Sequence, residues 1–412
     1  MIDEKKKFQE VLNVGLEVIQ TKDIDILLER ILTKARYLTN SDAGSIYIKD
    51  GEKLHFRHTQ NEALQKKLPA GKKLIYSTFT VPVNNQSISG YVAKNGEVLN
   101  IENVYDLTNR VPYSFDPSYD KISGYKTQSV LCFPLKTNND DVVGVLQLIN
   151  AKDGNGAIVP FLSEDEPFVV HFANNAAIAI ERATMTRDII LRMIKMAELR
   201  DPKETGAHVN RVSSYAVELY EAWALWQGIN PATIEQNKDV LKMSAMLHDV
   251  GKVAITDLIL KKPARLDEEE FEIMKKHTYL GAQLFSHQRS DFDRASFLVA
   301  LNHHERWDGT GYPGFVDFAT GSPLAGYASG NGHAMGKKGE EIPVFGRIVA
   351  IADVFDALSC GRSYKTAWTE ERVLETMYNE KGKHFDPDML GIFLSILDVV
   401  RNIAQLYPDT QE

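Results

Sequence analysis

Histidine and carboxylate side chains recur through the second half of the chain in groupings that suit metal binding. Eight of the 11 histidines follow residue 200. The groupings are Glu204 with His208, His248 with Asp249, His277, His303 with His304, and Asp353. Imidazole and carboxylate ligands without thiolate suit iron, manganese or zinc, and argue against a structural zinc site. Any one of these histidines alone is more often an ordinary core or surface residue, so the interpretation depends on the whole set.

The adjacent pair His248-Asp249 indicates a centre with more than one metal. A carboxylate can bridge two ions while the neighbouring histidine binds one of them. Two ions about 3.5–4 Å apart can activate water and clamp a phosphodiester for in-line attack. The residues therefore predict hydrolysis of a phosphodiester bond.

Helices must position these side chains, because the region after residue 200 has a helical pattern. An apolar helix precedes His248, and the run Ile348–Ala352 predicts a buried Asp353 at the end of another. Gly281, four residues after His277, would permit close packing of helices. The glycine-rich stretch from Gly309 to Gly339 is predicted as loop.

The first part of the chain has a different pattern. Residues 3–38 are predicted as helix, and short apolar runs bounded by turns predict strands at 45–48, 54–57, 98–101, 129–135 and 142–150. The first two strands flank a turn at 49–52 and are predicted to form a hairpin. Ser163 and Glu166 are predicted to form a capping box that starts a long helix reaching Arg200.

Length and composition agree with two globular domains in 412 residues. The net charge of −9 argues against a general nucleic-acid polymer or membrane-surface binder. Two distant cysteines, Cys132 and Cys360, suit a reducing compartment. No signal-type segment and no uncharged apolar run of membrane-spanning length is present, so a cytoplasmic protein is predicted.

Residues 20–185 resemble a GAF domain, chiefly through Asp42–Ile48 on the first strand and Val143–Asn150 on the last. This resemblance implies a sensor of an unknown small ligand or a dimerisation domain. The Asn-Lys-Phe-Asp-Glu pattern of cyclic-nucleotide-binding members is absent, so sensing of a cyclic nucleotide by this domain is not supported. His55, His58 and His171 have no metal-ligand spacing.

Residues 190–400 closely resemble the HD-GYP family of metal phosphohydrolases. The motifs are His248–Lys252, His277–Gly281, His303–Pro313 with its Gly-Tyr-Pro, and Asp353–Leu358. The resemblance implies hydrolysis of a cyclic dinucleotide, either cyclic di-GMP or 3′,3′-cyclic GMP-AMP, to the linear dinucleotide; further hydrolysis to mononucleotides stays open.

The resemblance also implies roles for individual residues. The metal ligands would be Glu204, His208, His248, Asp249, His277, His303, His304 and Asp353. They would hold two ions of iron or manganese, or three if Glu204 contributes. Asp249 and Lys252 would be catalytic. The sequence itself offers Lys252 no obvious acidic neighbour. The substrate contacts would be Lys252, Asp308, Tyr312, Arg362 and Lys365.

Two features depart from the family pattern. Ser363 replaces a usual proline, and residues 315–340 form a longer connection than usual beside the Gly-Tyr-Pro loop. This insertion could act as a lid or restrict which dinucleotide enters. His333 within it is interpreted as a solvated loop histidine.

The predicted architecture is an α+β GAF-like domain (1–185) with an antiparallel sheet and flanking helices, a helical connector (186–200), and an all-α HD-type domain (201–412). Apolar stripes on the helices at 3–22 and 168–200 predict a homodimer; the alternative is that both helices pack against the sheet of the same chain, which would leave a monomer. Two other functions remain open: a non-catalytic receptor for the dinucleotide, and a di-iron oxygenase of the same superfamily.

Overall fold

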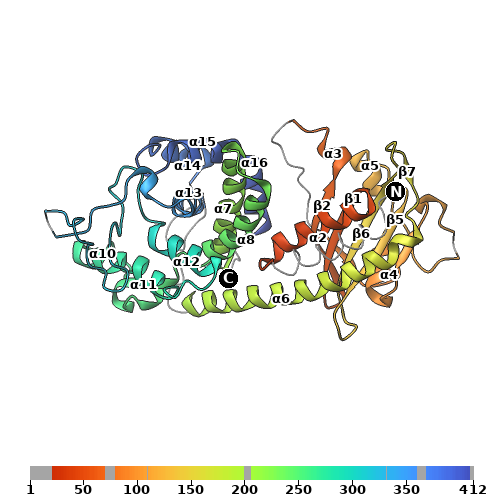
Figure 1. Cartoon of the computed structure of the whole chain (residues 1–412), viewed down its shortest axis with the longest axis horizontal. Coiled ribbons are helices and arrows are strands. Elements are labelled where there is room, and N and C mark those ends of the chain that lie inside the picture. Colours follow the sequence, from red (N-terminus) through yellow and green to blue (C-terminus); the bar gives the residue numbers. More distant parts are fainter. Residues whose placement is uncertain are drawn as a thin grey trace. The chain divides into compact units, whose positions relative to one another are not determined.

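The computed structural model describes residues 21–69, 79–108, 110–198, 206–330, 332–359 and 368–408 (Figure 1). The chain divides into two compact units, Met1–Arg187 and Asp188–Glu412. Helix α6 (Glu166–Glu198) runs through this division without a break, so the predicted connector is part of a longer helix. The finer boundaries given by the sequence remain a prediction.

The first unit is built on an antiparallel sheet, as predicted. Its strands are β1 (Ser41–Asp50), β2 (Lys53–Asn61), β3 (Thr80–Pro82), β4 (Leu99–Ile101), β5 (Val130–Lys136), β6 (Val142–Lys152) and β7 (Ile158–Val159). The order is β3-β2-β1-β6-β5-β4, with β7 paired to β6. The predicted hairpin of β1 and β2 is confirmed, with Asp50 opposite Lys53.

Apolar side chains alternate between the two faces of this sheet, because successive residues of a strand point to opposite sides. Ile46 and Leu146 lie on one face with α2 (Ile24–Thr39) and α6. Tyr47 and Val145 lie on the other face with α4 (Ile88–Asn95). The sheet is therefore covered by apolar side chains on both sides.

Several local features differ from the sequence prediction. The strands β3 and β7 and the helices α3 (Glu62–Gln65), α4 and α5 (Ser118–Ser123) were not predicted, because they are short. The predicted capping box is wrong: Ser163 lies in a 3-10 turn, and α6 begins only at Glu166. The predicted helix at 3–38 is described from Ile24 onward, and residues 3–20 lie outside the described residues.

The second unit is mostly helical, which confirms the predicted fold class. Its helices after α6 are α7 (Gly206–Trp226), α8 (Pro231–Ala245), α9 (Asp257–Leu260), α10 (Glu268–Lys275), α11 (His277–Gln283), α12 (Asp291–Asn302), α13 (Val344–Ser359), α14 (Glu370–Asn379), α15 (Pro387–Ser395) and α16 (Leu397–Leu406). Buried residues such as Tyr215, Leu241, Ile348 and Phe393 pack α7, α8 and α12 to α16 around one core. Helices α9, α10 and α11 pack in two smaller apolar clusters. The stretch between α12 and α13 is loop with two isolated bridges and one 3-10 turn, as predicted.

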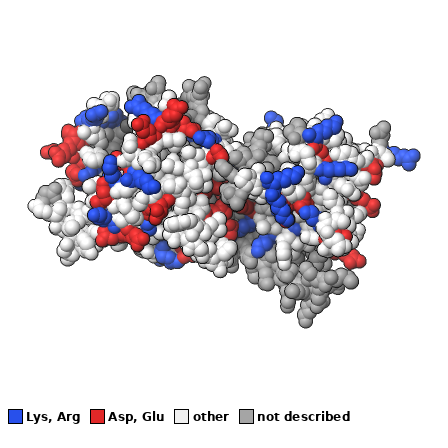
Figure 2. Space-filling model, turned by 90° about the horizontal axis from the view of Figure 1, so that it is seen from above, with Lys and Arg blue, Asp and Glu red and all other residues white. Residues whose placement is uncertain are grey.

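No single helix in the described ranges is long and apolar enough to cross a membrane; only α15 with α16 would be, as a pair bent by 69°. Both of these helices contribute buried residues, including Met389 and Val400, to the core of the second unit. On the face drawn in Figure 2, acidic and basic side chains are interspersed over the described surface.

Candidate metal centre

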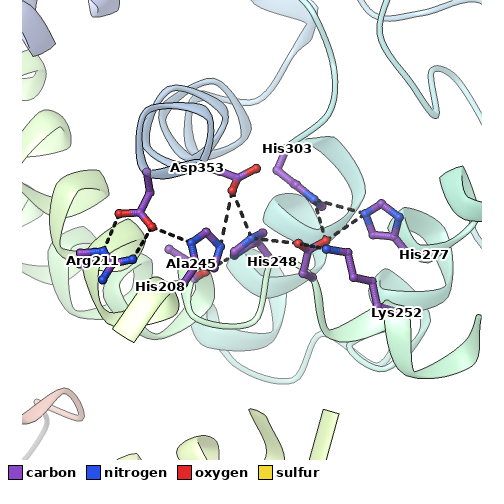
Figure 3. Close-up of polar contacts among 10 residues, drawn as sticks. His208, Arg211, Ala245, His248, Lys252, His277, His303 and Asp353 are labelled. Carbon is purple, nitrogen blue, oxygen red and sulfur yellow. Dashed lines mark hydrogen bonds and ion pairs between the residues drawn. The ribbon is translucent and has the colours of Figure 1, made fainter. Parts of the chain in front are cut away.

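Five separate segments of the second unit converge on one buried site (Figure 3). His208 comes from α7, the pair His248-Asp249 follows α8, and His277 is the first residue of α11. The remaining ligands are the pair His303-His304 directly after α12, and Asp353 within α13. All the predicted ligands that the structure describes are therefore brought together.

The predicted ligands form two neighbouring groups. One group is Asp249, His277, His303 and His304, and the other is His208, His248 and Asp353. Within each group, one potential ligand atom per residue lies within 4.8 Å of the others. Two groups of this size match a centre with at least two ions.

Asp249 lies between the two groups. Its Oδ1 is 3.1 Å from Nε2 of His277 and 3.5 Å from Nε2 of His303. Its Oδ2 is 3.3 Å from Nε2 of His248. In the second group, Oδ1 of Asp353 is 3.6 Å from Nε2 of His208 and 4.0 Å from Nε2 of His248. The two oxygens of Asp249 thus face different groups, which is the arrangement that a bridging carboxylate requires.

Backbone carbonyls orient three of the imidazoles. Nδ1 of His248 lies 2.8 Å from the carbonyl oxygen of Ala245, and Nδ1 of His277 lies 2.7 Å from that of Met274. Nδ1 of His303 lies 3.1 Å from the carbonyl oxygens of Val299 and Ala300. A carbonyl can only accept, so Nδ1 carries the proton and the lone pair of Nε2 points into the site.

His208 is oriented by a buried carboxylate that the sequence analysis missed. Oδ2 of Asp356 lies 2.8 Å from Nδ1 of His208. Arg211 donates to the same carboxylate, from Nε to Oδ1 at 2.7 Å and from its NH2 nitrogen to Oδ2 at 2.9 Å. Asp356 follows Asp353 by three residues, and Arg211 follows His208 by three. This helical spacing was the signal that could have identified the network.

Burial and neighbouring charges set the protonation of the site. Burial alone would raise the pKa of the Asp249 carboxyl, but Lys252 and His248 hold that pKa well below its usual value. Burial lowers the pKa of His303, and lowers that of His304 further. Burial alone would also raise the pKa of Asp356, yet His208 and Arg211 lower it. These shifts favour the ionised form of Asp249 and the neutral forms of His303 and His304, which are the forms that bind metals.

The residues present fit divalent metal ions. Their donors are imidazole nitrogens and carboxylate oxygens, a set suited to iron, manganese or zinc. Among the residues that the structure describes, Oδ1 of Asp249 is buried and accepts no hydrogen bond. A buried carboxylate oxygen without such a partner is costly unless something else, such as a cation, satisfies it.

Lys252 and Tyr312 lie beside the ligands. Lys252 is in the 3-10 turn Val250–Ala254, and its Nζ is 2.7 Å from Oδ2 of Asp249. The prediction that Lys252 lacks an acidic neighbour is therefore wrong. The ring of Tyr312 stacks on His304, with centroids 4.8 Å apart and planes at 29°.

The other predicted residues have different positions. Asp308 accepts hydrogen bonds from the backbone N–H and hydroxyl of Thr310, in the loop that leads to Tyr312. Asp353 is not at the end of its helix, because α13 continues to Ser359. Glu204, Arg362 and Lys365 lie outside the described residues.

The predicted close approach at Gly281 is confirmed. A Cβ on Gly251 would lie 1.9 Å from the carbonyl oxygen of His277 and 2.5 Å from the nitrogen of Gly281. The turn that carries Lys252 can therefore rest on α11 only because both positions lack side chains. This contact brings the segments of Asp249 and His277 together.

Comparison with known families agrees with this division. A family model of the GAF domain matches residues 23–180, and a model of the HD domain matches residues 205–358. The two models cover the sheet unit and the part of the helical unit that contains the described ligands.

Several curated proteins are similar to this chain. A "3′3′-cGAMP-specific phosphodiesterase 2" of Vibrio cholerae is 35% identical over 235 residues, which are 57% of this chain and 39% of that protein. A "Cyclic di-GMP phosphodiesterase" of Vibrio cholerae is 36% identical over 262 residues, 61% of this chain and 49% of that protein. A "Cyclic di-GMP phosphodiesterase response regulator" of Xanthomonas campestris is 38% identical over 208 residues, 50% of this chain and 47% of that protein.

The chain spans less than half of the length of these three relatives. The GAF model nevertheless matches the unit that contains the sheet, and the HD model matches the helical unit that contains the candidate metal ligands. The family models therefore identify a GAF domain followed by an HD domain in this chain, and the His-Asp and Gly-Tyr-Pro motifs of the second domain resemble those of the HD-GYP group.

Proposed function

We propose that the chain is a metal-dependent phosphodiesterase that hydrolyses a cyclic dinucleotide to the linear dinucleotide. The observation that carries this proposal is Asp249, whose two carboxylate oxygens face two groups of ligands beside the Gly-Tyr-Pro loop. The substrate is cyclic di-GMP or 3′,3′-cyclic GMP-AMP, since both occur in the names of the similar proteins.

The proposed metals are two or three ions of iron or manganese. His208, His248, Asp249, His277, His303, His304 and Asp353 would hold them, with Glu204 as the ligand of a third ion. When bound, the ions would polarise the phosphodiester and lower the pKa of water.

The chain's own charged side chains would bind and orient the phosphodiester. Lys252 places an ammonium group beside Asp249, where it would stabilise negative charge that develops on the phosphate oxygens. The ring of Tyr312 stacks on His304, where it would face the substrate. Asp308, Arg362 and Lys365 are proposed as further substrate contacts.

Product analysis tests the proposal. We expect protein purified without oxygen and loaded with iron or manganese to convert at least one of the two cyclic dinucleotides to its linear form. Removal of the metal should stop the reaction, and restoring it should recover activity. Tight dinucleotide binding without turnover would indicate the receptor, and oxygen consumption without phosphodiester cleavage would indicate the oxygenase.

The GAF domain is proposed to bind a small regulatory ligand. A cavity of about 540 Å³ lies over one face of the sheet, and its walls include Tyr47, Phe56, Phe79 and Gln147. This volume falls in the range of small-molecule sites.

A cytoplasmic location is also proposed, and the buried free thiol of Cys132 fits a reducing compartment.

A homodimer is proposed from the exposed apolar stripe of α6. Its members share one side of the helix, since their spacing follows the period of 3.6 residues. They are Ile178, Met185, Ile189, Met193 and Met196, with exposures of 37%, 65%, 46%, 44% and 69%. The same helix of a second copy is the proposed partner. The helix predicted at 3–22, which the sequence also favours for this role, lies outside the described residues.

Sedimentation tests the dimer. We expect the full chain to be dimeric at micromolar concentration, and a Met185→Glu, Met193→Glu double variant to be monomeric because charge on the stripe opposes association. Leu258→Glu, at a position that is 84% exposed on α9, is the control and should remain dimeric. A monomeric wild-type chain would exclude the proposal.

A further inference from the structure

The insertion beside the Gly-Tyr-Pro loop is closed at its base. We define the insertion as residues 315–335. The N–H of Phe315 donates to the carbonyl oxygen of Met335 at 3.0 Å. A Cβ on Gly314 would lie 2.2 Å from that same oxygen, and a Cβ on Gly336 would lie 2.3 Å from the carbonyl oxygen of Gly309. The two ends of the insertion therefore meet directly against the loop that carries Tyr312.

Glu305 ties both flanks of the insertion to the segment that carries two predicted metal ligands. It follows His303-His304 and is only 2% exposed. Its Oε1 accepts the N–H of Gly314 at 2.7 Å, and its Oε2 accepts the N–H of Lys337 at 3.2 Å. The base of the insertion thus has a fixed position relative to His304.

The insertion is also held along its side. The amide nitrogen of Gln283, at the end of α11, donates to the carbonyl oxygens of Phe318 at 2.8 Å and Ala319 at 3.0 Å. The ring of Phe318 packs edge-on against Phe297 of α12, with centroids 5.1 Å apart. These contacts hold the insertion against α11 and α12, which argues against a lid that opens and closes.

A cavity of about 810 Å³ lies between the insertion and the Gly-Tyr-Pro loop. Residues 308–311 form one side, and Phe315, Tyr327 and Met335 of the insertion line the other. Gly311, which lines the cavity, directly precedes Tyr312, whose ring stacks on the predicted ligand His304.

The insertion presents an aromatic surface to the cavity. Phe315 and Tyr327 are stacked, with centroids 4.0 Å apart and planes at 26°. The ammonium nitrogen of Lys337 lies 5.7 Å from the centroid of Phe315. Tyr327 remains 40% exposed and can therefore accept another flat ring. Nucleobases stack on aromatic side chains in this way, because every base has a flat π face.

We propose that the insertion forms a subsite for one nucleobase of the cyclic dinucleotide, with Tyr327 as the stacking surface. This inference rests on the proposed function and adds the site of base binding. Tyr327 acts in substrate binding and touches none of the predicted metal ligands among its described contacts. Its loss therefore weakens binding and leaves the chemical step intact.

The test compares Tyr327→Ala with Tyr327→Phe. For the manganese-loaded full chain, we expect Tyr327→Ala to raise KM about tenfold at unchanged kcat, the scale of losing one base–aromatic stack. Tyr327→Phe should restore the wild-type KM, because phenylalanine keeps the ring. Tyr378→Ala, at a position that is 62% exposed on α14 and outside the cavity lining, is the matched control. Equal thermal stability of the variants excludes a folding effect.

Binding to the metal-depleted protein separates the two proposals. Calorimetry with cyclic di-GMP and 3′,3′-cyclic GMP-AMP should show the same tenfold loss of affinity in Tyr327→Ala. If the wild-type chain binds a dinucleotide without hydrolysing it and Tyr327→Ala binds it more weakly, the subsite stands and the proposed activity fails. If the wild-type chain is active and Tyr327→Ala matches it in KM and affinity, the subsite is wrong. If the wild-type chain neither binds nor hydrolyses either dinucleotide, both proposals are overturned.

Discussion

An Asp249→Ala chain is expected to hydrolyse no cyclic dinucleotide and to retain less metal than the wild type. Asp249 is the one described carboxylate whose oxygens face both groups of ligands, at 3.1 Å from His277 and 3.3 Å from His248. Its loss leaves the group of His277, His303 and His304 without its carboxylate, removes the oxygen that faces the second group, and removes one of the negative charges that offset the cations. Metal analysis and a turnover assay on the same preparation measure both effects.

The matched control is Asp398→Ala, at a half-exposed position on α16. It should retain metal and activity. Calorimetric unfolding of Asp249→Ala should still show the transition of the GAF domain, because the core of that domain contains none of the predicted ligands. Full activity in metal-depleted Asp249→Ala protein would exclude the assigned site.

Lys252→Ala is expected to lower kcat by roughly 10²–10³ while the metals stay bound, the scale for losing one donor to the transition state. The ammonium group lies 2.7 Å from Oδ2 of Asp249 and is largely buried, with 18% of the side chain exposed. Asp249 keeps its contacts with His248 and His277 in the variant. Pre-steady-state turnover, normalised to bound metal, measures the change.

Because Lys252 also pairs with Asp249, its effect on metal retention must be measured separately. Lys261→Ala is the control, since Lys261 forms a comparable but exposed pair with Asp257 at 3.1 Å. A wild-type kcat per bound metal in Lys252→Ala would refute a role in the chemical step. Loss of the metals with no change in kcat per metal would assign Lys252 to the support of Asp249 instead.

The sequence predicted the larger features of the fold because those features repeat. Near-continuous apolar runs over β5 and β6 specify strands with two covered faces, and the structure confirms them. The short strands β3 and β7 have too few residues for a period to be visible. Ser163 has the residue type of a helix cap, but a local 3-10 turn takes that position.

In the candidate site, the residues of sequence motifs could be predicted, whereas the residues whose role depends on tertiary packing were missed. His248, Asp249 and their counterparts could be named because their types and order match a known pattern. Asp356 and Arg211 were not named, since their spacing places them beside Asp353 and His208 but does not show that α7 and α13 lie side by side. The partnership of Lys252 with Asp249 likewise depends on the 3-10 turn after α8, which periodicity does not predict.

The closed base of the insertion has a consequence for how substrate preference can change. When the ends of a loop are already fixed, each doubling of its length costs only about 0.6 kcal/mol of chain entropy. Here Glu305 and the contact between Phe315 and Met335 fix those ends. Residues between them that do not contact the helices can thus be added or removed at little cost in chain entropy, whereas Phe318 and the backbone bound by Gln283 are held in place. The chain therefore combines a buried set of ligands with a loop whose length can change without disturbing them.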